Sequence, residues 1–255
     1  MTNSETRIRP LRHSGFGFHS DFGFRHSGFP SDNHCMDVII LGAGGHGKVV
    51  LDILRAAGEH NPVGFIDADR SLAGTTVARL PVLGPSNLLP KLRQQQKVKG
   101  AIVAIGDNRT RRSCAALVRE HGFELVNAIH PAAVVSPGAT LGRNVVVCAG
   151  ACVCVEARLA DSVIVNTNAV VDHECEIDEA AHVCPGALLA GRVRIGAGAF
   201  IGLGAKVIPC MTVGAGAVVG AGAVVIEDVP AGATVVGVPA RVVKLAETAG
   251  KRAEP

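Results

Sequence analysis

The hydrophobic pattern of the chain changes abruptly near residue 129. From Ile129 to Val225, seventeen consecutive sixth positions are occupied by Ile, Val or Leu. The fourth residue after each of these is mostly alanine. A strict six-residue period predicts a parallel β-helix, in which each hexad forms one side of a triangular coil. The aliphatic residue of each hexad is expected to point inward, and Gly or Asn is expected to turn the corners.

The geometry of such a coil determines which residues are neighbours. Three hexads complete one coil, and successive coils stack about 4.8 Å apart, as neighbouring strands do. Each residue is therefore expected to lie beneath the residue about 18 positions further along. We predict a β-helix domain over residues 129–230, with roughly five to six coils, followed by a C-terminal cap and tail over residues 231–255.

A different pattern precedes the repeats, because residues 37–128 alternate between short apolar runs and segments with helical spacing. This alternation predicts an α/β, Rossmann-like domain with a parallel sheet. The expected strands are 37–41, 63–66 and 101–105, and the expected helices are 48–57 and 109–121.

Residues 1–35 have neither a helix nor a strand period. The sequence RHSGF occurs twice, and five of the eight Phe residues of the chain lie in this segment. We expect a disordered low-complexity extension. Met36, which precedes the first strand, is an alternative start of the protein, and a metal-binding histidine tail is an alternative role for the segment.

Composition narrows the possible functions. The net charge is only +3 and no basic block is present, so binding of nucleic acid is not expected. The absence of Trp and Tyr suits a narrow core of small and β-branched residues. The eight cysteines lack zinc-site spacing and are expected to be free thiols in the cytoplasm. No apolar run reaches the roughly 18 residues of a membrane span.

Several segments together resemble one known family. They are VIILGAGGHGKVV, AIGDNRTR, LVNAIHPAAVVSPGA, VNTNAVVDHEC, HVCPGALLAG, IGAGAFIGLGAKV and VVGVPAR, spread over residues 37–244. In this order they resemble the hexapeptide-repeat sugar O-/N-acyltransferases of the sialic-acid O-acetyltransferase type. That family includes bacterial acetyltransferases of UDP- and GDP-linked 4-amino sugars, and GDNRTR and LVNAIHP are similar to segments of the GDP-perosamine enzymes.

The resemblance implies a left-handed β-helix and a homotrimer whose active sites lie between neighbouring columns. It implies acetyl-CoA as the co-substrate, without a metal, and a nucleotide sugar held by the N-terminal domain. The implied reaction is direct acetyl transfer to the sugar amine, in the cytoplasm of a bacterium, for cell-surface glycan synthesis.

The segment Asp172-His173-Glu174 carries the chemistry that acetyl transfer to an amine requires. A histidine titrates near neutral pH and can accept the amine proton, and a neighbouring carboxylate can orient its ring. His173 is the second residue after Val171, which places it near a corner of the coil. The resemblance assigns the orienting role to Glu174, and the sequence leaves Asp172 as an alternative. A solvated turn histidine is the non-catalytic interpretation.

Gly191 is expected one coil above His173, because it is the eighteenth residue after it. A glycine at that place lets a backbone N–H approach a ligand closely, and the resemblance implies that this N–H binds the thioester oxygen. The resemblance also implies that His182, Leu203 and Ala221 contact CoA. A plain corner glycine and a core or surface histidine are the alternatives.

Two turns of the N-terminal domain are expected to bind the nucleotide sugar. The first is glycine-rich, follows a strand and opens a helix, which suits a pyrophosphate. Asp67, after the second strand, is placed to bond a ribose hydroxyl. A helix N-cap is the alternative role for Asp107 and Asn108 in the second turn. The candidate substrate contacts are Gly44, Gly45, His46, Asp67, Gly106 and Asn108.

Three other functions share parts of this pattern. O-acetylation of sialic acid or another sugar would use the same base on a hydroxyl. An NAD(P)-binding regulatory module on a structural β-helix shares the glycine-rich turn, but this domain is short and no dehydrogenase catalytic domain follows it. A carbonic-anhydrase-like metal protein needs three histidines on adjacent faces, whereas His130, His173 and His182 occupy different places in their hexads.

Overall fold

The computed structural model describes residues 35–95 and 98–245. The extension predicted over residues 1–35 therefore lies almost entirely outside the described residues, as does the end of the tail predicted over 231–255. None of the described helices is both long enough and apolar enough to span a bilayer.

The N-terminal part forms a sheet in the order β3-β4-β2-β1-β5-β6. Its parallel strands are β1 (Asp37–Leu41), β2 (Asn61–Ile66), β4 (Leu80–Gly84), β5 (Gly100–Val103) and β6 (Glu124–Leu125). The helices are α1 (Gly45–Ala57), α2 (Leu89–Gln95) and α3 (Asn108–Glu120), with 3-10 turns at Arg70–Leu72 and Ser86–Leu88. This arrangement confirms the predicted α/β, Rossmann-like class.

A hairpin between β3 (Thr76–Val77) and β4 is not indicated by the sequence pattern. The two strands are antiparallel, and Ala78 and Arg79 join them with φ angles of 45° and 62°. Two successive left-handed residues are typical of tight hairpin turns, where Asn and Gly are the usual occupants. Because Ala-Arg lacks that signature, the turn is visible only in the structure.

Helix α1 begins within the glycine-rich turn and packs one side into the core. Val50, Leu51, Ile53 and Leu54 are all buried. The helix ends at Gly58, whose φ of 68° lets its N–H donate to the Leu54 carbonyl. The helix thus ends at the predicted residue 57 but begins three residues before the predicted start at 48.

From β7 onward the chain forms a left-handed parallel β-helix of two-residue strands with three faces. The first face contains β7 (Ala128–Ile129), β10 (Val146–Val147), β13 (Ile164–Val165), β16 (His182–Val183), β19 (Phe200–Ile201), β22 (Val218–Val219), β24 (Thr234–Val236) and the antiparallel β25 (Arg241–Lys244). The second face contains β8 (Val134–Val135), β11 (Cys152–Val153), β14 (Val170–Val171), β17 (Leu188–Leu189), β20 (Lys206–Val207) and β23 (Val224–Val225). The third face contains β9 (Thr140–Leu141), β12 (Arg158–Leu159), β15 (Glu176–Ile177), β18 (Arg194–Ile195) and β21 (Thr212–Val213).

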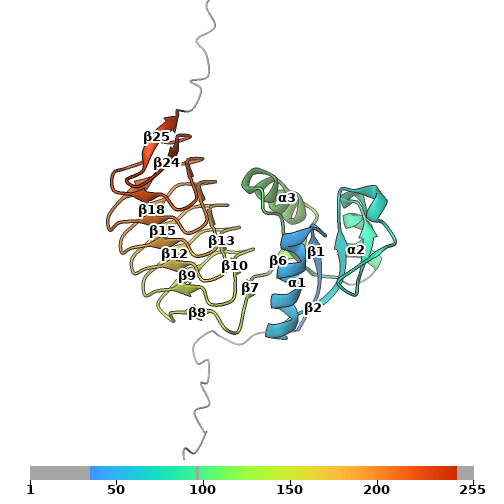
Figure 1. Cartoon of the computed structure of the whole chain (residues 1–255). Helices are drawn as coiled ribbons and strands as arrows, with labels where there is room; N and C mark the ends of the chain where they lie inside the picture. Colours follow the sequence, from blue (N-terminus) through green and yellow to red (C-terminus); the bar gives the residue numbers. More distant parts are fainter. Residues whose placement is uncertain (1–34, 96–97, 246–255) are drawn as a thin grey trace, which may run out of the picture. The chain divides into compact units, whose positions relative to one another are not determined.

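The strand register confirms the predicted coil length. Val153 pairs with Val171, and Val171 pairs with Leu189, so each coil contains eighteen residues. Figure 1 shows the third-face strands β9, β12, β15 and β18 stacked along the column.

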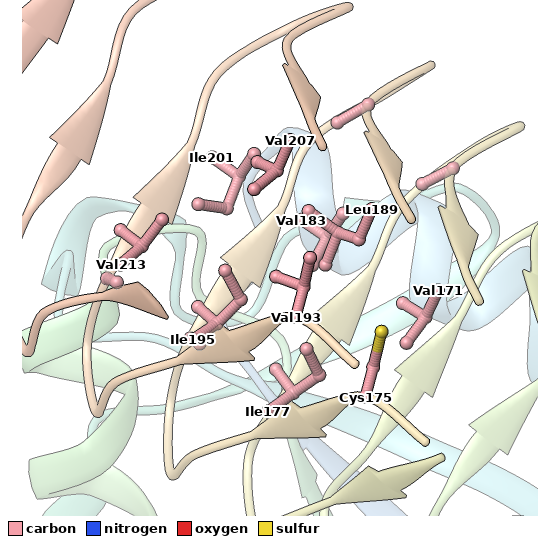
Figure 2. Close-up of a cluster of buried hydrophobic side chains, with 14 of the residues drawn as sticks. Val171, Cys175, Ile177, Val183, Leu189, Val193, Ile195, Ile201, Val207 and Val213 are labelled. Carbon is pink, nitrogen blue, oxygen red and sulfur yellow. The ribbon is translucent and has the colours of Figure 1, made fainter. Parts of the chain in front are cut away.

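The sixth-position aliphatic residues fill the interior, as predicted. Figure 2 shows Val171, Ile177, Val183 and Leu189 within one cluster of side chains, and each is at most 2% exposed. The alanines that follow them, such as Ala181, are fully buried. Small and aliphatic residues therefore alternate in a core that has little room for aromatic rings.

The corner between the second and third faces differs from the expectation that Gly or Asn turns each corner. Its left-handed positions hold Glu156, Glu174, Arg192 and Cys210, with φ angles of 59°, 57°, 60° and 64°. A residue with a Cβ costs about 1–2 kcal/mol in this conformation. The corner between the third and first faces likewise holds Ser162 and Ala180, with φ angles of 62° and 56°, so residues other than Gly and Asn turn two of the three corners in part.

Candidate active site

His173 follows β14 and lies at this same corner. Its ring Nδ1 is 2.9 Å from Glu174 Oε2, while its backbone N–H donates to Asp172 Oδ1 at 2.7 Å. A carboxylate accepts hydrogen bonds, so the contact with Glu174 favours the tautomer that has its proton on Nδ1 and a free lone pair on Nε2. Between the two acids that the sequence left open, the structure places Glu174 against the ring.

The His173 and Glu174 side chains are both accessible to a substrate. They are 46% and 48% exposed. Both residues lie at the corner between β14 and β15, and Glu174 has a left-handed φ of 57°. The pair is therefore available to a ligand that approaches the column from outside.

Gly191 lies one coil further along, over the His173 ring. A Cβ placed on Gly191 would overlap His173 Nε2, and the next residue, Arg192, donates its N–H to the His173 carbonyl at 2.9 Å. The N–H of Gly191 has no acceptor within residues 35–95 and 98–245. A free backbone donor thus lies beside the basic nitrogen, at a place where only glycine leaves room.

A groove of about 390 Å³ runs from Glu174 across the third face. Both acidic and basic side chains line it, and Arg194 Nε lies 3.4 Å from Glu176 Oε2. The lining residues are Glu156, Arg158, Glu174, Glu176, Arg192, Arg194, Cys210 and Thr212. A polar surface therefore lies beside Glu174, the partner of the candidate base His173.

His182 lies on the first face, away from the corner that holds His173. It is 8% exposed, its Nε2 is 3.1 Å from Asn166 Nδ2, and its ring packs edge to face with Phe200 at 5.3 Å between centroids. Burial and the nearby Arg111 lower the pKa of His182 to about 4, so the ring is neutral at neutral pH. Its contact with CoA stays a prediction.

Leu203 and Ala221 occupy successive coils at the corner between the first and second faces. The Gly222 N–H donates to the Leu203 carbonyl at 2.8 Å, and Leu203 is 58% exposed. Within one chain the second face separates this pair from His173. An apolar ligand wall formed by Leu203 and Ala221 also stays a prediction.

The glycine-rich turn leaves open space where a ligand would lie. A Cβ on Gly44 or Gly45 would meet no atom within 4 Å, and no side chain caps α1 there. The Asp67 carboxylate accepts the N–H of Ala43 at 2.7 Å, which ties the turn to the end of β2. Burial lowers the pKa of His46 to about 4, so its ring is neutral as well.

The second turn combines structural and open positions. Asp107 caps α3 by accepting the Thr110 N–H at 2.8 Å, which is the alternative role that the sequence suggested. The amide of Asn108 donates to the carbonyls of Gly198 and Ala199 in the β-helix. Gly106 faces open space, and a nucleotide contact by Gly106 or Asn108 stays a prediction.

Sequence reasoning missed Arg111, which lies one helical turn after this loop. Its side chain is 0% exposed. The guanidinium donates to the carbonyls of Ile105 and Gly106 at 2.9 and 3.0 Å, and to Asn108 Oδ1 at 2.8 Å. The amphipathic pattern of α3 could have indicated Arg111, because this arginine interrupts the face of the helix that is buried.

The described residues contain no group of three or more His, Cys, Asp or Glu side chains placed to hold a metal ion. The eight cysteines are all free thiols, and burial raises the pKa of Cys148, Cys175 and Cys184 to about 11, 11 and 12. These buried thiols are protonated at neutral pH and pack as small apolar groups.

Comparison with known proteins identifies the family of the chain. The family described as PglD N-terminal domain matches residues 37–118. PerB from Caulobacter crescentus, solved in complex with CoA and GDP-perosamine, is 47% identical with a TM-score of 0.77, over 81% of this chain and 96% of that one. The chain belongs to the hexapeptide-repeat sugar N-acyltransferases.

Two further relatives of this sugar N-acyltransferase match different lengths of the chain. The acetyltransferase domain of PglB from Neisseria gonorrhoeae, in complex with acetyl coenzyme A, is 42% identical with a TM-score of 0.77, over 82% of this chain and all (100%) of that one. The UDP-N-acetylbacillosamine N-acetyltransferase of Bacillus subtilis is 33% identical over 114 residues, which are 44% of this chain and 51% of that protein. The matched segment therefore spans about half the length of this curated relative.

Proposed function

We propose that this sugar N-acyltransferase transfers the acetyl group of acetyl-CoA to the amine of a GDP-linked 4-amino sugar, with His173 as the general base. The main support for this proposal is that His173 contacts Glu174 on one side and Gly191 on the other. The 47% identity with PerB, whose structure holds CoA and GDP-perosamine, supports the choice of nucleotide sugar.

The reaction uses the two sides of the His173 ring. Nε2 accepts a proton from the sugar amine as its nitrogen attacks the thioester carbonyl carbon, and Glu174 stabilises the imidazolium that forms. The Gly191 N–H donates to the oxyanion of the tetrahedral intermediate. The C–S bond then breaks, the C–N bond remains, and the proton passes from His173 to the departing thiolate.

The nucleotide is proposed to bind at the first turn of α1. The unoccupied N–H groups of the helix N-terminus suit the pyrophosphate, and the open space at Gly44 and Gly45 lets it approach the backbone. His46 and Gly106 border the same region. Asp67 holds the turn through Ala43 and is the candidate partner for a ribose hydroxyl.

A homotrimer is part of the proposal, and the side chains on the second face support it. The outward residues of this face are mostly apolar, and Val134 and Leu188 are 64% and 41% exposed in the single chain. The full outward series is Val134, Cys152, Val170, Leu188, Lys206 and Val224, whereas the third face presents Thr140, Arg158, Glu176, Arg194 and Thr212. An exposed apolar face of this kind marks a surface that another subunit covers.

Three-fold packing would also complete the CoA site. If three second faces surround one axis, the edge of one face meets the opposite edge of the next. The corner of His173 in one subunit would then lie near Leu203 and Ala221 of its neighbour. In a single chain, the base and the proposed apolar ligand wall lie on opposite edges of the second face. Three-fold packing would bring them together.

The cytoplasm is the proposed location, because acetyl-CoA and nucleotide sugars are both made there. The eight free thiols fit a reducing compartment.

The test follows release of the CoA thiol from acetyl-CoA with a panel of acceptors: GDP- and UDP-linked 4-amino sugars, and sialic acid. Turnover is expected with a GDP-linked amino sugar, and His173→Asn should reduce its kcat by roughly 10²–10⁴. Turnover with sialic acid alone would show O-acetylation and overturn the proposal. A UDP-linked sugar as the better substrate would overturn the choice of nucleotide, and full activity of His173→Asn would overturn the choice of base.

A further inference from the structure

Helix α3 lies along the corner between the third and first faces of the β-helix. On its exposed side, Arg112 pairs with Glu179 at 2.8 Å and Arg119 pairs with Asp161 at 2.7 Å. Glu179 and Asp161 belong to successive coils, because the two are eighteen residues apart. These ion pairs therefore connect α3, which follows the second nucleotide turn, to two successive coils and not to a single loop.

Arg111 makes the buried part of this contact. Besides its bonds to the turn, its guanidinium donates to the carbonyls of Ser162 and Ala180, each at 2.8 Å. Ser162 and Ala180 also lie on successive coils. The planar fork of one side chain thus joins the loop after β5 to two coils of the β-helix.

The chemistry of this contact is unusual for a buried cation. None of the ion pairs in the described part of the chain includes Arg111. Its acceptors are carbonyl oxygens and one amide oxygen. Burying a charge is costly, and apolar residues in its place usually stabilise a fold at least as well as a buried charged group does. Burial lowers the pKa of Arg111 only to about 10, so the group stays charged at neutral pH.

The charge of Arg111 acts on two candidate ligand-contacting histidines. The positive charge of Arg111 adds to burial in lowering the pKa values of His46 and His182. His46 belongs to the first nucleotide turn, and His182 belongs to the first face. Asp107, the cap of α3, is the acidic group whose charge acts on Arg111. Arg111 therefore contacts the second nucleotide turn and the β-helix directly, and it acts on His46 of the first turn through its charge.

We propose that Arg111 is a positioning residue, which holds the turn Ile105–Asn108 in a fixed place on the coils so that the bound nucleotide sugar presents its amine to the base. The inference rests on the proposed function. Arg111 itself touches neither substrate. Its loss should therefore affect use of the nucleotide sugar, which the N-terminal part is proposed to bind. Use of acetyl-CoA should change little, because Asn166 and Phe200 hold the ring of His182, the candidate CoA contact.

The test compares Arg111→Lys and Arg111→Gln with Arg112→Ala in the full-length protein. Lysine keeps the charge and loses the fork, whereas glutamine keeps a donor and brings no charge into the interior. Arg112→Ala is the matched control, since it removes an exposed bridge from the same helix to the same column. Folding of each variant is checked by circular dichroism and thermal melting before kinetics.

For the two Arg111 variants, we expect kcat/KM for the nucleotide sugar to fall at least tenfold, with KM for acetyl-CoA within about twofold of the wild type. Arg112→Ala should leave both unchanged. Equal losses for both substrates, unchanged kinetics, or the failure of both variants to fold would each overturn the proposal.

The proposed function and this inference fail in different ways. The kinetic split is measured with whichever nucleotide sugar the wild-type protein acetylates. If the wild type acetylates none, the proposed function has failed, and calorimetric titration with GDP and acetyl-CoA tests Arg111 instead. GDP binding that weakens in the Arg111 variants while acetyl-CoA binding stays constant would support the positioning role, and equal effects on both ligands would refute it.

Discussion

Gly191 lies directly over Nε2 of His173, one coil further along the column, and a Cβ at this glycine would overlap the imidazole. The φ angle of Gly191 is not in the left-handed region, so alanine is compatible with its backbone. Gly191→Ala should therefore fold normally and displace the ring. We expect kcat to fall by roughly 10²-fold, through a misplaced base and a blocked oxyanion donor.

The matched control for this variant is Gly138→Ala. Gly138 is also a glycine of the β-helix without a left-handed φ, and the nearest atom to a Cβ there would be a Val155 methyl at 3.2 Å. Activity within twofold of the wild type is expected for the control. Wild-type kcat in Gly191→Ala would mean that the ring and the N–H do not work together.

Glu174→Gln should lower kcat by about tenfold, less than replacement of the base itself. Glutamine can still accept from Nδ1 and hold the tautomer, but it cannot stabilise the imidazolium by charge. Glu176→Gln makes the same charge change in the same groove, where Glu176 pairs with Arg194. Steady-state kinetics of the two variants should differ, and equal effects would assign the loss to the groove charge in general.

Much of the β-helix follows from local pattern. One hexad is a complete structural unit, so a period of six residues fixes the coil, and the pairing of Val153 with Val171 follows by arithmetic. The same arithmetic predicts that Gly191 lies over His173, which the structure bears out geometrically. The hairpin at Ala78 and Arg79 does not follow, because its left-handed turn contains no residue that favours it.

The partners of Arg111, in contrast to its place on the buried face of α3, could not be predicted, for a different reason. Its β-helix partners are backbone carbonyls of Ser162 and Ala180, at separations of 51 and 69 residues. A carbonyl has no side-chain signature, so the sequence contains no complementary residue to search for. The choice between Asp172 and Glu174 likewise needed coordinates, since both flank His173 and only side-chain geometry separates them.

Acidification should destabilise the protein between pH 6.5 and 4. The pKa of His182 is about 4 when folded and near its usual 6.5 when unfolded. The unfolded chain therefore binds more protons in this window, and the free energy of unfolding rises with pH from 4 to 6.5. The contribution is on the order of 3 kcal/mol. Denaturant melts across this range measure it.

His182→Gln isolates the histidine from the carboxylates that titrate at lower pH. The variant removes one titrating group, so its stability should fall less steeply than that of the wild type as the pH drops from 6.5 to 4. An unchanged slope would show that His182 takes up its proton equally well in the folded state.

Leu188→Asp should weaken the proposed trimer. Leu188 points outward from the second face and is 41% exposed in the single chain, so an aspartate there affects the fold of one column little but would bury a charge in the interface. We expect a shift from trimer toward monomer by light scattering and a parallel loss of activity, because the CoA site needs a neighbour. Thr140→Asp places the same charge at an outward position of the third face, and it should leave both assembly and activity unchanged. An active, monomeric Leu188→Asp protein would show that one column suffices for catalysis.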